Sequence, residues 1–401
     1  MLRVLTLSTL FPDATRPSFG VFVERQTRGL AALPDVEVQV VAPIGVPPWP
    51  LSRHPNWRGL AAIPERETWR GLMVHRPRFP ILPGMGTLNP RSIAGTLLPM
   101  LRAVRKSFPF DVIDAEFFFP DGPAAVRLAR ALGVPVSIKA RGADIHHWGR
   151  QRSTAGQVRD AGLAADGILA VSAALKADMV ALGLPAERIR VHYTGVDLDR
   201  FRPSPDRMAA KAALGVTGPL LVSVGALIPR KGHDLAIAAM RDLPGATLMI
   251  AGNGPEKAAL DALIAAQGLG DRVRLLGSQP HDALPAWAAA ADVGVLVSSS
   301  EGLANAWVEA LACGAPIVIA DVGGARELVD RPEAGRLVVR EPAAIAAGVR
   351  ELLAAHYDPL AVRATAERFT WEANAAALRE HLAGLVGQGM RRFPSSSSSR
   401  T

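Results

Sequence analysis

Short apolar runs that alternate with helical patterns constrain the fold of this chain more than any other feature. The runs are continuous in Val, Ile and Leu, which is typical of parallel strands covered by helices on both faces. In the first half, the expected strands are Leu2–Leu7, Val36–Val41, Val112–Ala115, Val134–Ala140 and Gly167–Val171. In the second half, they are Leu220–Val224, Thr247–Ala251, Val273–Leu276, Val293–Val297 and Pro316–Ile319. Two such series in tandem predict two doubly wound α/β domains.

The length of 401 residues suits two domains of ordinary size. Residues Thr194–Pro205, with one glycine and two prolines, are the expected linker, so we place the first domain at 1–195 and the second at 196–370. The segment 42–90 does not fit the series, because it is dense in proline and tryptophan. We expect a binding loop there, or a decorated loop with one or two short strands. The serine-rich end, 389–401, is predicted to be disordered.

Composition excludes several classes of protein. A hydrophobic content of 49% excludes disorder for the body of the chain. The single cysteine, Cys313, excludes a disulfide scaffold and a cysteine-based zinc site, and it fits a reducing cytoplasm. No apolar run reaches the roughly 18–20 residues that a membrane span needs. We therefore expect a cytoplasmic protein.

The net charge of +8 is unevenly distributed. Residues 1–185 hold 22 Lys and Arg against 14 Asp and Glu, whereas the remainder is balanced at 23 of each. A basic first half suggests an acidic partner, such as lipid phosphates, diphosphates or nucleic acid. Ordinary surface charge is the alternative interpretation.

A glycine turn with two cations follows the expected strand Leu220–Val224. Gly225 opens it, and Arg230 and Lys231 come just before a helix. Ligands of open α/β sheets bind beyond the carboxyl ends of the strands, so this turn predicts a diphosphate cradle. A solvated Arg-Lys pair is the alternative. No P-loop motif occurs. The dinucleotide fingerprint Gly-x-Gly-x-x-Gly is incomplete, because Gly252 and Gly254 are followed by Lys257 at the position of the third glycine.

The segment from Ser298 to Leu328 combines glycine loops with two carboxylates. Glu301 precedes a helix that we expect to start near Asn305 as its N-cap, and Glu309 lies one turn inside it. Two carboxylates that accept hydrogen bonds at different depths of one cleft suit hydroxyl-rich ligands such as a hexose and a ribose. For Glu309 alone, an exposed helical glutamate is the simpler interpretation.

This segment resembles the signature of glycosyltransferase family 4, which comprises retaining enzymes of GT-B architecture that use nucleotide sugars. The glutamate pair is followed by Ala-x-Ala-x-Gly-x-Pro-x-Val at 310–318 and Gly-Gly-x-x-Glu at 323–327. The Gly225 loop is similar to the family's donor-diphosphate loop. Residues 193–201 resemble its interdomain element, with Thr194 in place of an asparagine. The resemblance is good over 185–385 and looser before it.

The resemblance implies two Rossmann-like domains that face a central cleft, with a helix at 371–388 crossing back to the first domain. It implies that Glu301 contacts the hydroxyls of the donor sugar, and that Arg230 and Lys231 bind the diphosphate and stabilise its growing charge. The other implied donor-site residues are Gly20, Gly225, Gly302, Leu303, Ala304, Asn305 and Glu309, the last of them holding the ribose. The donor would be UDP- or GDP-linked.

The N-terminal half departs from the pattern of many relatives. It has Arg141-Gly142-Ala143-Asp144 where they carry His-Gly-x-Asp, and a second frequent histidine is replaced around Glu116. A subgroup similar to Pro120-Asp121-Gly122 with Arg-Gly-x-Asp exists. We expect Arg141 to bind phosphate, and Asp144 or His146 to contact the acceptor. A structural role is the alternative for His146.

The mechanism follows in part from what is missing. A double displacement needs a carboxylate nucleophile beneath the anomeric carbon. Glu301 is the only candidate, and the resemblance assigns it to sugar binding. Front-face attack with retention is therefore expected. With no Asp-x-Asp cluster beside the donor loops, we expect no cofactor and no metal requirement.

Three functions remain for comparison. The first is a glycosyltransferase that builds a surface polysaccharide or glycolipid on a glycan or lipid-diphosphate-linked acceptor, with its basic half on the inner face of an anionic membrane. The second is a nucleotide-sugar epimerase on the same fold. The third is a nucleic-acid-binding protein, suggested by a pI of about 10.3, but no nucleic-acid motif supports it. We expect the first.

Overall fold

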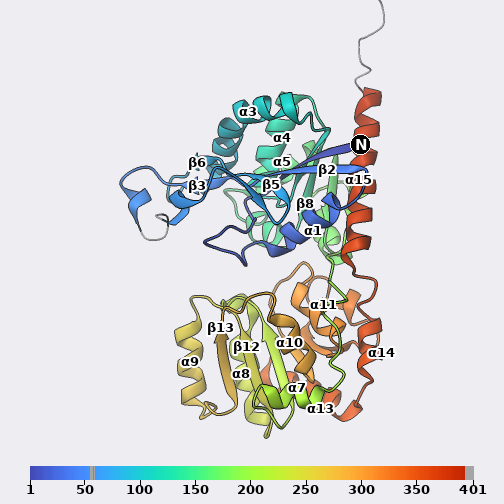
Figure 1. Cartoon of the computed structure of the whole chain (residues 1–401). Helices are drawn as coiled ribbons and strands as arrows, with labels where there is room; N and C mark the ends of the chain where they lie inside the picture. The colour runs from blue at the N-terminus through green and yellow to red at the C-terminus, as the bar shows by residue number, and fades with distance from the viewer. Residues whose placement is uncertain (55–56, 58, 393–401) are drawn as a thin grey trace, which may run out of the picture. The chain divides into compact units, whose positions relative to one another are not determined.

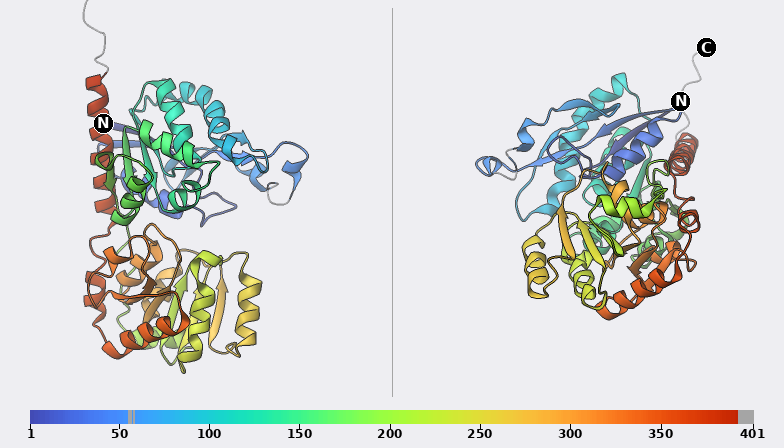
Figure 2. Two further views of the ribbon diagram at one scale, coloured as in Figure 1. Left: turned by 180° about the vertical axis from the view of Figure 1, so that it is seen from behind. Right: turned by 60° about the horizontal axis from the view of Figure 1, so that its bottom comes forward.

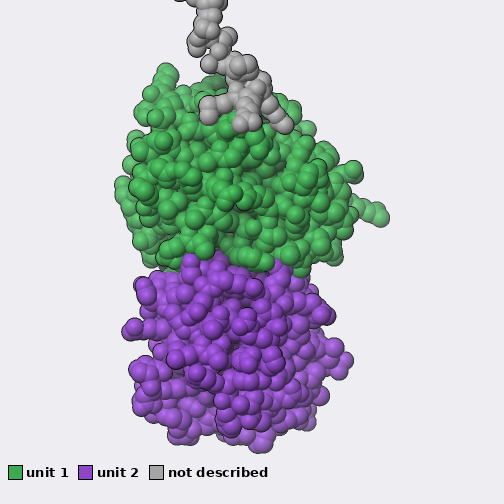
Figure 3. Space-filling view, turned by 90° about the vertical axis from the view of Figure 1, so that its right-hand side faces the viewer, with its two compact units in different colours: residues 1–193, 371–401 green, residues 194–370 purple. Residues whose placement is uncertain are grey.

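The computed structural model describes residues 1–54, 57 and 59–392, and the chain divides into two compact units. Unit 1 comprises Met1–Tyr193 together with the chain from Trp371 on, and unit 2 comprises Thr194–Thr370 (Figures 1 and 3). The division falls next to the boundary expected from the linker. No helix among the described residues is both long and apolar enough to cross a membrane.

Unit 2 contains a parallel six-stranded sheet in the order β13-β12-β11-β14-β15-β16. The strands are β11 Leu220–Val224, β12 Thr247–Ala251, β13 Val273–Gly277, β14 Val293–Leu296, β15 Ile317–Ala320 and β16 Gly335–Val338. Five of them lie within a residue of the predicted ranges, and β16 was not predicted. The order reverses between β11 and β14, which makes this pair the topological switch point of the sheet.

Helices connect successive strands of unit 2, as parallel pairing requires, and further helices precede β11 or follow β16. They are α7 Arg207–Ala213, α8 His233–Ala239, α9 Lys257–Ala266, α10 Leu284–Ala290, α11 Asn305–Ala312, α12 Ala325–Leu328, α13 Pro342–Ala355 and α14 Pro359–Ala364. A core cluster joins β11, β12 and β14 to α8, α9 and α13 through buried residues such as Leu221, Ile237, Leu248 and Val349.

Unit 1 contains an eight-stranded sheet in the order β10-β9-β8-β7-β1-β2-β5-β4. Its strands are β1 Leu2–Leu7, β2 Val36–Val41, β4 Arg66–Trp69, β5 Leu72–His75, β7 Val112–Ala115, β8 Val136–Ala140, β9 Gly167–Ala170 and β10 Ile189–Val191. Its helices include α1 Val21–Ala31, α3 Asn89–Ser107, α4 Asp121–Leu132, α5 Ala155–Ala164 and α6 Ala173–Ala181. Only β4 is antiparallel to its neighbour. The switch point of this sheet lies between β1 and β7.

The prediction of one or two short strands in 42–90 is wrong, because four strands occur there. Strands β4 and β5 form a hairpin, and β5 extends the main sheet beside β2. Arg70 (φ 47°) and Gly71 (φ 88°) form its two-residue turn, with positive φ at both positions as a type I′ turn requires. The other two strands, β3 Ile44–Val46 and β6 Arg78–Pro80, pair separately in parallel.

Helix α15, Trp371–Arg392, belongs to unit 1. Its buried Leu378 and Leu382 pack with Leu2 and Val4 of β1 and with Val112 of β7. His381 contacts Ser137 of β8, Nε2 to Oγ, at 3.1 Å. Disorder was expected from residue 389, but the helix continues to Arg392, and the rest of that segment, 393–401, lies outside the described residues.

The His381 contact predicts a pH-dependent stability. Burial, aided by the charges of Arg190 and Lys139, lowers the pKa of His381 from 6.5 to about 4. Below pH 6.5 the unfolded chain binds a proton that the folded chain excludes, so His381 destabilises the fold progressively as the pH drops toward 4. The stability advantage of the wild type over His381→Gln should therefore shrink by up to about 3 kcal/mol across this window. Urea unfolding at several pH values measures it, and a constant difference between the two proteins would contradict the prediction.

Candidate functional site

Two loops meet at the switch point of unit 2, one after β11 and one after β14. The first contains a short helical turn, Pro229–Lys231, closed by Gly232 with φ 69°. A Cβ atom on Gly232 would lie 2.6 Å from the carbonyl oxygen of Val297, so only glycine lets the loop lie against the end of β14. The backbone N–H of Ser299 donates to the carbonyl of Arg230 at 2.8 Å. The loop that carries the two cations is thereby fixed to its neighbour.

Glu301 forms ion pairs with both cations of this loop. Its Oε1 lies 2.5 Å from Lys231 Nζ and 3.2 Å from Arg230 Nη1. The carboxylate is buried, which by itself would raise the pKa of Glu301, but the charges of Lys231 and Arg230 outweigh burial and lower it. Arg230 also donates to the carbonyl of Ser300 at 2.5 Å. The three predicted catalytic residues thus form one charged group with a net positive charge, in which the carboxylate is buried and the Arg230 side chain is 36% exposed.

Glycines allow the flanking loops to approach this group. A side chain on Gly252 would overlap the carbonyl of Gly225, and one on Gly254 would overlap the carbonyl of Leu227. The glycine pair that fails as a dinucleotide fingerprint therefore packs the loop after β12 against the Gly225 loop. A side chain on Gly323 would likewise overlap the carbonyl of Glu301. These contacts hold the backbone around the charged group.

Helix α11 begins at Asn305, but Asn305 is not its N-cap. The cap position is occupied by Ala304, whose side chain makes no capping hydrogen bond. Asn305 instead accepts a 2.7 Å hydrogen bond from the hydroxyl of Thr194, which stands in the family's asparagine position. Leu303 and Ala304 are buried beside it. Asn305 therefore joins the loop after β14 to the beginning of unit 2.

Glu309 contacts His281, Oε1 to Nε2, at 3.1 Å. Its side chain is 13% exposed, so the simple interpretation of an exposed helical glutamate is wrong. The ring of His281 also packs edge-on against Phe201, with centroids 5.7 Å apart. Glu309 is therefore an oriented acceptor on α11, separate from the cations that hold Glu301.

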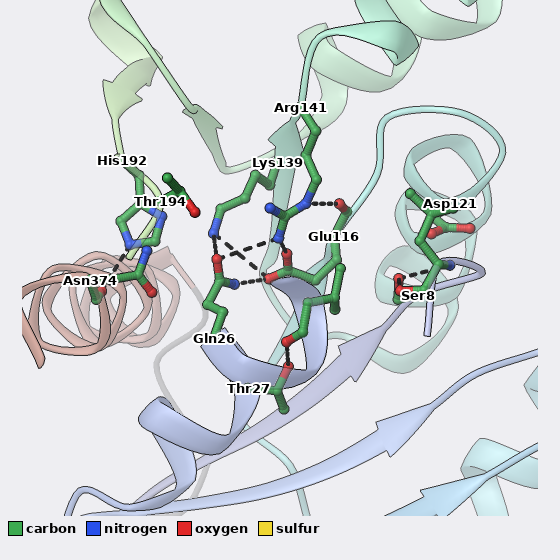
Figure 4. Close-up of polar contacts among 12 residues, drawn as sticks. Ser8, Gln26, Thr27, Glu116, Asp121, Lys139, Arg141, His192, Thr194 and Asn374 are labelled. Carbon is green, nitrogen blue, oxygen red and sulfur yellow. Dashed lines mark hydrogen bonds and ion pairs between the residues drawn. The ribbon is translucent and has the colours of Figure 1, made fainter. Parts of the chain in front are cut away.

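Unit 1 has its own charged cluster at the carboxyl ends of β7 and β8 (Figure 4). Gln26 of α1 accepts a hydrogen bond from Lys139 Nζ and donates one to Glu116 Oε1. Arg141 donates from Nη2 to Glu116 Oε2 and from Nε to the Glu116 carbonyl, the latter at 3.0 Å. The guanidinium lies over the ring of Phe22 at 4.6 Å. Arg141 is therefore held in one orientation.

The electrostatics of this cluster favour binding of an anion. Burial by itself would raise the pKa of Glu116, but the charges of Lys139 and Arg141 outweigh it and lower that pKa to about 2. Burial lowers the pKa of Lys139 to about 8 and raises that of Asp114 well above its usual range. The upward shift favours the neutral form of Asp114, and in that form the side chains of Asp114, Glu116, Lys139 and Arg141 carry one net positive charge. Buried charges of this kind are costly, so their presence at a ligand-binding edge marks a candidate site.

The other residues expected on the acceptor side have structural partners. Asp144 is buried and accepts backbone N–H bonds from Phe118, Arg141 and Gly142 at 3.0, 3.0 and 2.8 Å. Its oxygens close the turn after β8, so the geometry does not favour the expected acceptor contact. His146 contacts Asp178 of α6 at 2.8 Å, apart from the Arg141 cluster. Its structural interpretation is the better one.

Gly20 is the N-cap of α1, with φ 71°, and a side chain there would overlap the carbonyl of Leu10. The loop after β1 is also tied to α4, because the Thr9 N–H donates to Asp121 Oδ2 at 2.9 Å. Burial raises the pKa of Asp121 to about 7. Both residues therefore shape the loop at the switch point of unit 1.

Sequence reasoning missed Gln26 and Lys139 as members of this cluster. Lys139 carried a usable signal, because a charged residue inside a strand buried on both faces is costly unless it is paired. Gln26 carried none, since a glutamine on an amphipathic helix is ordinary. Its role depends on how α1 packs across the sheet.

Two family models match the chain. The model for glycosyl transferases group 1 matches residues 206–369, and the model for Glycosyltransferase Family 4 matches residues 20–200. The two matches adjoin near the boundary between the units and together include both charged clusters.

Individual relatives match most of the chain. It is 29% identical over 338 residues to the teichuronic acid biosynthesis glycosyltransferase TuaC of Bacillus subtilis, covering 82% of this chain and 83% of that protein. It is 29% identical over 355 residues to a GDP-mannose-dependent alpha-(1-6)-phosphatidylinositol monomannoside mannosyltransferase of Mycobacterium tuberculosis, covering 82% and 88%. Among solved structures, Anabaena HepE in complex with UDP has a TM-score of 0.72 at 20% identity, covering 96% of this chain and all of that one.

The buried cluster of unit 1 predicts a strong effect of removing one charge. Glu116→Gln should destabilise unit 1 by about 3–5 kcal/mol, because Lys139 stays buried without its anion. The double variant Glu116→Gln/Lys139→Met should recover much of that loss. Urea unfolding measures both.

An exposed pair in the same unit provides the control. Glu380 pairs with Arg190 at 2.9 Å, with side chains 69% and 49% exposed, so Glu380→Gln should cost less than about 1 kcal/mol. Equal losses for Glu116→Gln and Glu380→Gln would show that the cluster holds no buried ion pair.

Proposed function

This chain belongs to glycosyltransferase family 4 and has the GT-B fold, and we propose that it transfers a hexosyl group from a nucleoside-diphosphate sugar with retention of configuration. The acceptor is a hydroxyl of a glycan or of a lipid-linked molecule. The pathway is the synthesis of a cell-surface polysaccharide or glycolipid. The names of the two bacterial relatives support this pathway, since one refers to teichuronic acid and the other to a phosphatidylinositol mannoside.

The observation that carries the proposal is the position of Arg230 and Lys231 at the switch point of unit 2. Two fixed cations at the carboxyl edge of a doubly wound sheet suit a diphosphate. When the glycosidic bond breaks, negative charge grows on the departing diphosphate, and preorganised cations stabilise it without reorganisation. In this scheme no cofactor or metal ion is needed to balance that charge.

The pairing of Glu301 supports front-face transfer. In a double displacement, this carboxylate would attack the anomeric carbon. Here it is tied to Lys231 and Arg230, and we propose that it accepts hydrogen bonds from sugar hydroxyls once the diphosphate takes over the cations. The departing oxygen then accepts the proton of the attacking hydroxyl on the same face. We propose that Glu309, whose orientation is fixed by His281, accepts hydrogen bonds from the ribose hydroxyls.

The donor is a UDP- or GDP-linked sugar. One neighbouring structure contains UDP and one relative is GDP-mannose-dependent, so both bases occur among similar proteins. We propose Arg141 as the residue that binds the acceptor, because its orientation is fixed and the cluster around it favours a net positive charge. A phosphate of the acceptor is the group that it would bind. A nucleotide-sugar epimerase would act without any acceptor, and an assay with and without acceptor separates the two reactions.

A thermal-shift series tests the donor site. UDP, GDP, ADP, CMP and NAD are compared on the wild type and on Arg230→Ala/Lys231→Ala. One nucleoside diphosphate at 100 times its dissociation constant should stabilise the wild type by about 2.7 kcal/mol. The double variant should lose this stabilisation, and EDTA should leave it unchanged in the wild type.

The matched control is Lys257→Ala/Arg274→Ala, which removes one lysine and one arginine with exposed contacts elsewhere in unit 2. It should keep the full ligand shift. Stabilisation by NAD alone, or an equal shift in the Arg230→Ala/Lys231→Ala protein, would overturn the assignment of the donor site.

A further inference from the structure

Exposed hydrophobic side chains of unit 1 gather in one region. Eleven large hydrophobic side chains are exposed among the residues that the structure describes, and five of them lie between residues 49 and 88. They are Trp49, Leu51, Leu82, Met85 and Leu88, with Trp49 exposed to 73%. We call these five residues the apolar tip. Such a concentration of exposed apolar surface marks an interaction site.

The pairing of β3 with β6 brings the two halves of the tip together. Val46 and Pro80 are partners at the carboxyl ends of these parallel strands, and the Ile81 N–H donates to the Val46 carbonyl at 3.1 Å. Trp49 and Leu82 lie only a few residues beyond this pair. The two chain segments therefore leave the ribbon side by side, with Trp49 following one strand and Leu82 the other.

The tip extends from the carboxyl edge of the main sheet of unit 1. Strand β2 leads into β3 and β5 leads into β6, and Val41 pairs with His75 in the same register in which Ile44 pairs with Arg78. The β3–β6 ribbon thus continues the β2–β5 pairing beyond that edge. Figures 1 and 2 show the ribbon and the following blue segment standing out from the body of unit 1. The Arg141 cluster lies at the same edge.

Basic residues accompany the apolar tip. Residues 44–91 contain seven arginines and two glutamates. Arg53 follows Leu51 in a short helical turn, and Arg91 lies in the first turn of α3 just after Leu88, both exposed. Exposed arginines beside tryptophan, leucine and methionine match the boundary of an anionic bilayer, where apolar side chains enter the acyl region and cations meet lipid phosphates.

We propose that the apolar tip inserts into the interface of an anionic lipid bilayer, with Arg53 and Arg91 on the lipid phosphates. The charge favours this occupant over a second copy of the chain, because two copies of a basic tip repel each other. The insertion brings the carboxyl edge of unit 1 toward the membrane surface, where a lipid-linked acceptor is available. This consequence rests on the proposed function, whereas membrane binding itself does not.

Vesicle flotation tests the proposal without donor or acceptor. The full chain is mixed with vesicles of phosphatidylcholine alone, or of phosphatidylcholine and phosphatidylglycerol in equal amounts. The wild type should float with the anionic vesicles and bind them at least about tenfold more tightly than the neutral ones. Trp49→Ser/Leu82→Ser/Met85→Ser should lower binding to anionic vesicles by about tenfold or more, since three inserted side chains are lost.

A control variant changes three exposed hydrophobic residues of unit 2. Met208→Ser/Val339→Ser/Leu360→Ser replaces side chains that are 64%, 63% and 64% exposed, and it should bind vesicles as the wild type does. Arg53→Glu/Arg91→Glu should lose the preference for anionic vesicles. The nucleoside-diphosphate shift of each variant shows that it is folded and tests the donor site separately.

Two results would overturn the proposal. One is a wild type that floats with neither kind of vesicle. The other is a tip variant that binds anionic vesicles as well as the unit 2 control does. Neither result would affect the nucleotide site of unit 2, so the failure of this proposal can be told from the failure of the proposed function.

Discussion

The ion pairs of Glu301 with Lys231 and Arg230 are the interaction on which the site of unit 2 depends. They join the loops after β11 and β14, the two strands between which the sheet reverses its order. The positive φ of Gly232 and its close approach to Val297 make this contact sterically possible. Because the carboxylate is buried with two cations, the loops hold a net positive charge before any ligand arrives. Under the proposed function, these cations are already in place to stabilise a diphosphate once Glu301 gives up at least one of its ion pairs.

Unit 1 also has a charged group at the carboxyl edge of its sheet, beyond β7 and β8. Arg141 lies beyond β8, and its orientation depends on Glu116. The charge of Lys139, 3.8 Å from Glu116 Oε1, favours the ionised form of that carboxylate. Gln26 forms hydrogen bonds with both Lys139 and Glu116. Burying three hydrophobic side chains of the same size would cost less free energy than burying Glu116, Lys139 and Arg141. Their presence therefore favours a function. An arginine held in one orientation binds a phosphate or a carboxylate well. Lys139 therefore influences Arg141 indirectly, because it favours the ionised form of Glu116, and Glu116 positions Arg141.

The sequence predicted the regular parts of the fold and the residues that form the charged group at the switch point of unit 2. Continuous apolar runs located β1, β2, β7 and five strands of unit 2, because burial on both faces leaves a clear pattern. The β4–β5 hairpin was missed, since Arg70 gives no signal for a turn position with positive φ, unlike asparagine or aspartate. Asn305 was misjudged as an N-cap because its partner, Thr194, lies 111 residues away in the chain. In the Lys139–Gln26–Glu116 cluster, Lys139 carries a local signal as a charged residue inside a buried strand, but its partners depend on packing between three elements, which no local pattern encodes.

A crystal structure of the chain with the nucleoside diphosphate that stabilises it would test the central claim most directly. We expect the diphosphate within hydrogen-bonding distance of Arg230 and Lys231, with Glu301 released from at least one of its ion pairs. The ribose should contact Glu309. A nucleotide bound elsewhere, with the ion pairs of Glu301 intact and no ligand at the switch point of unit 2, would contradict the account.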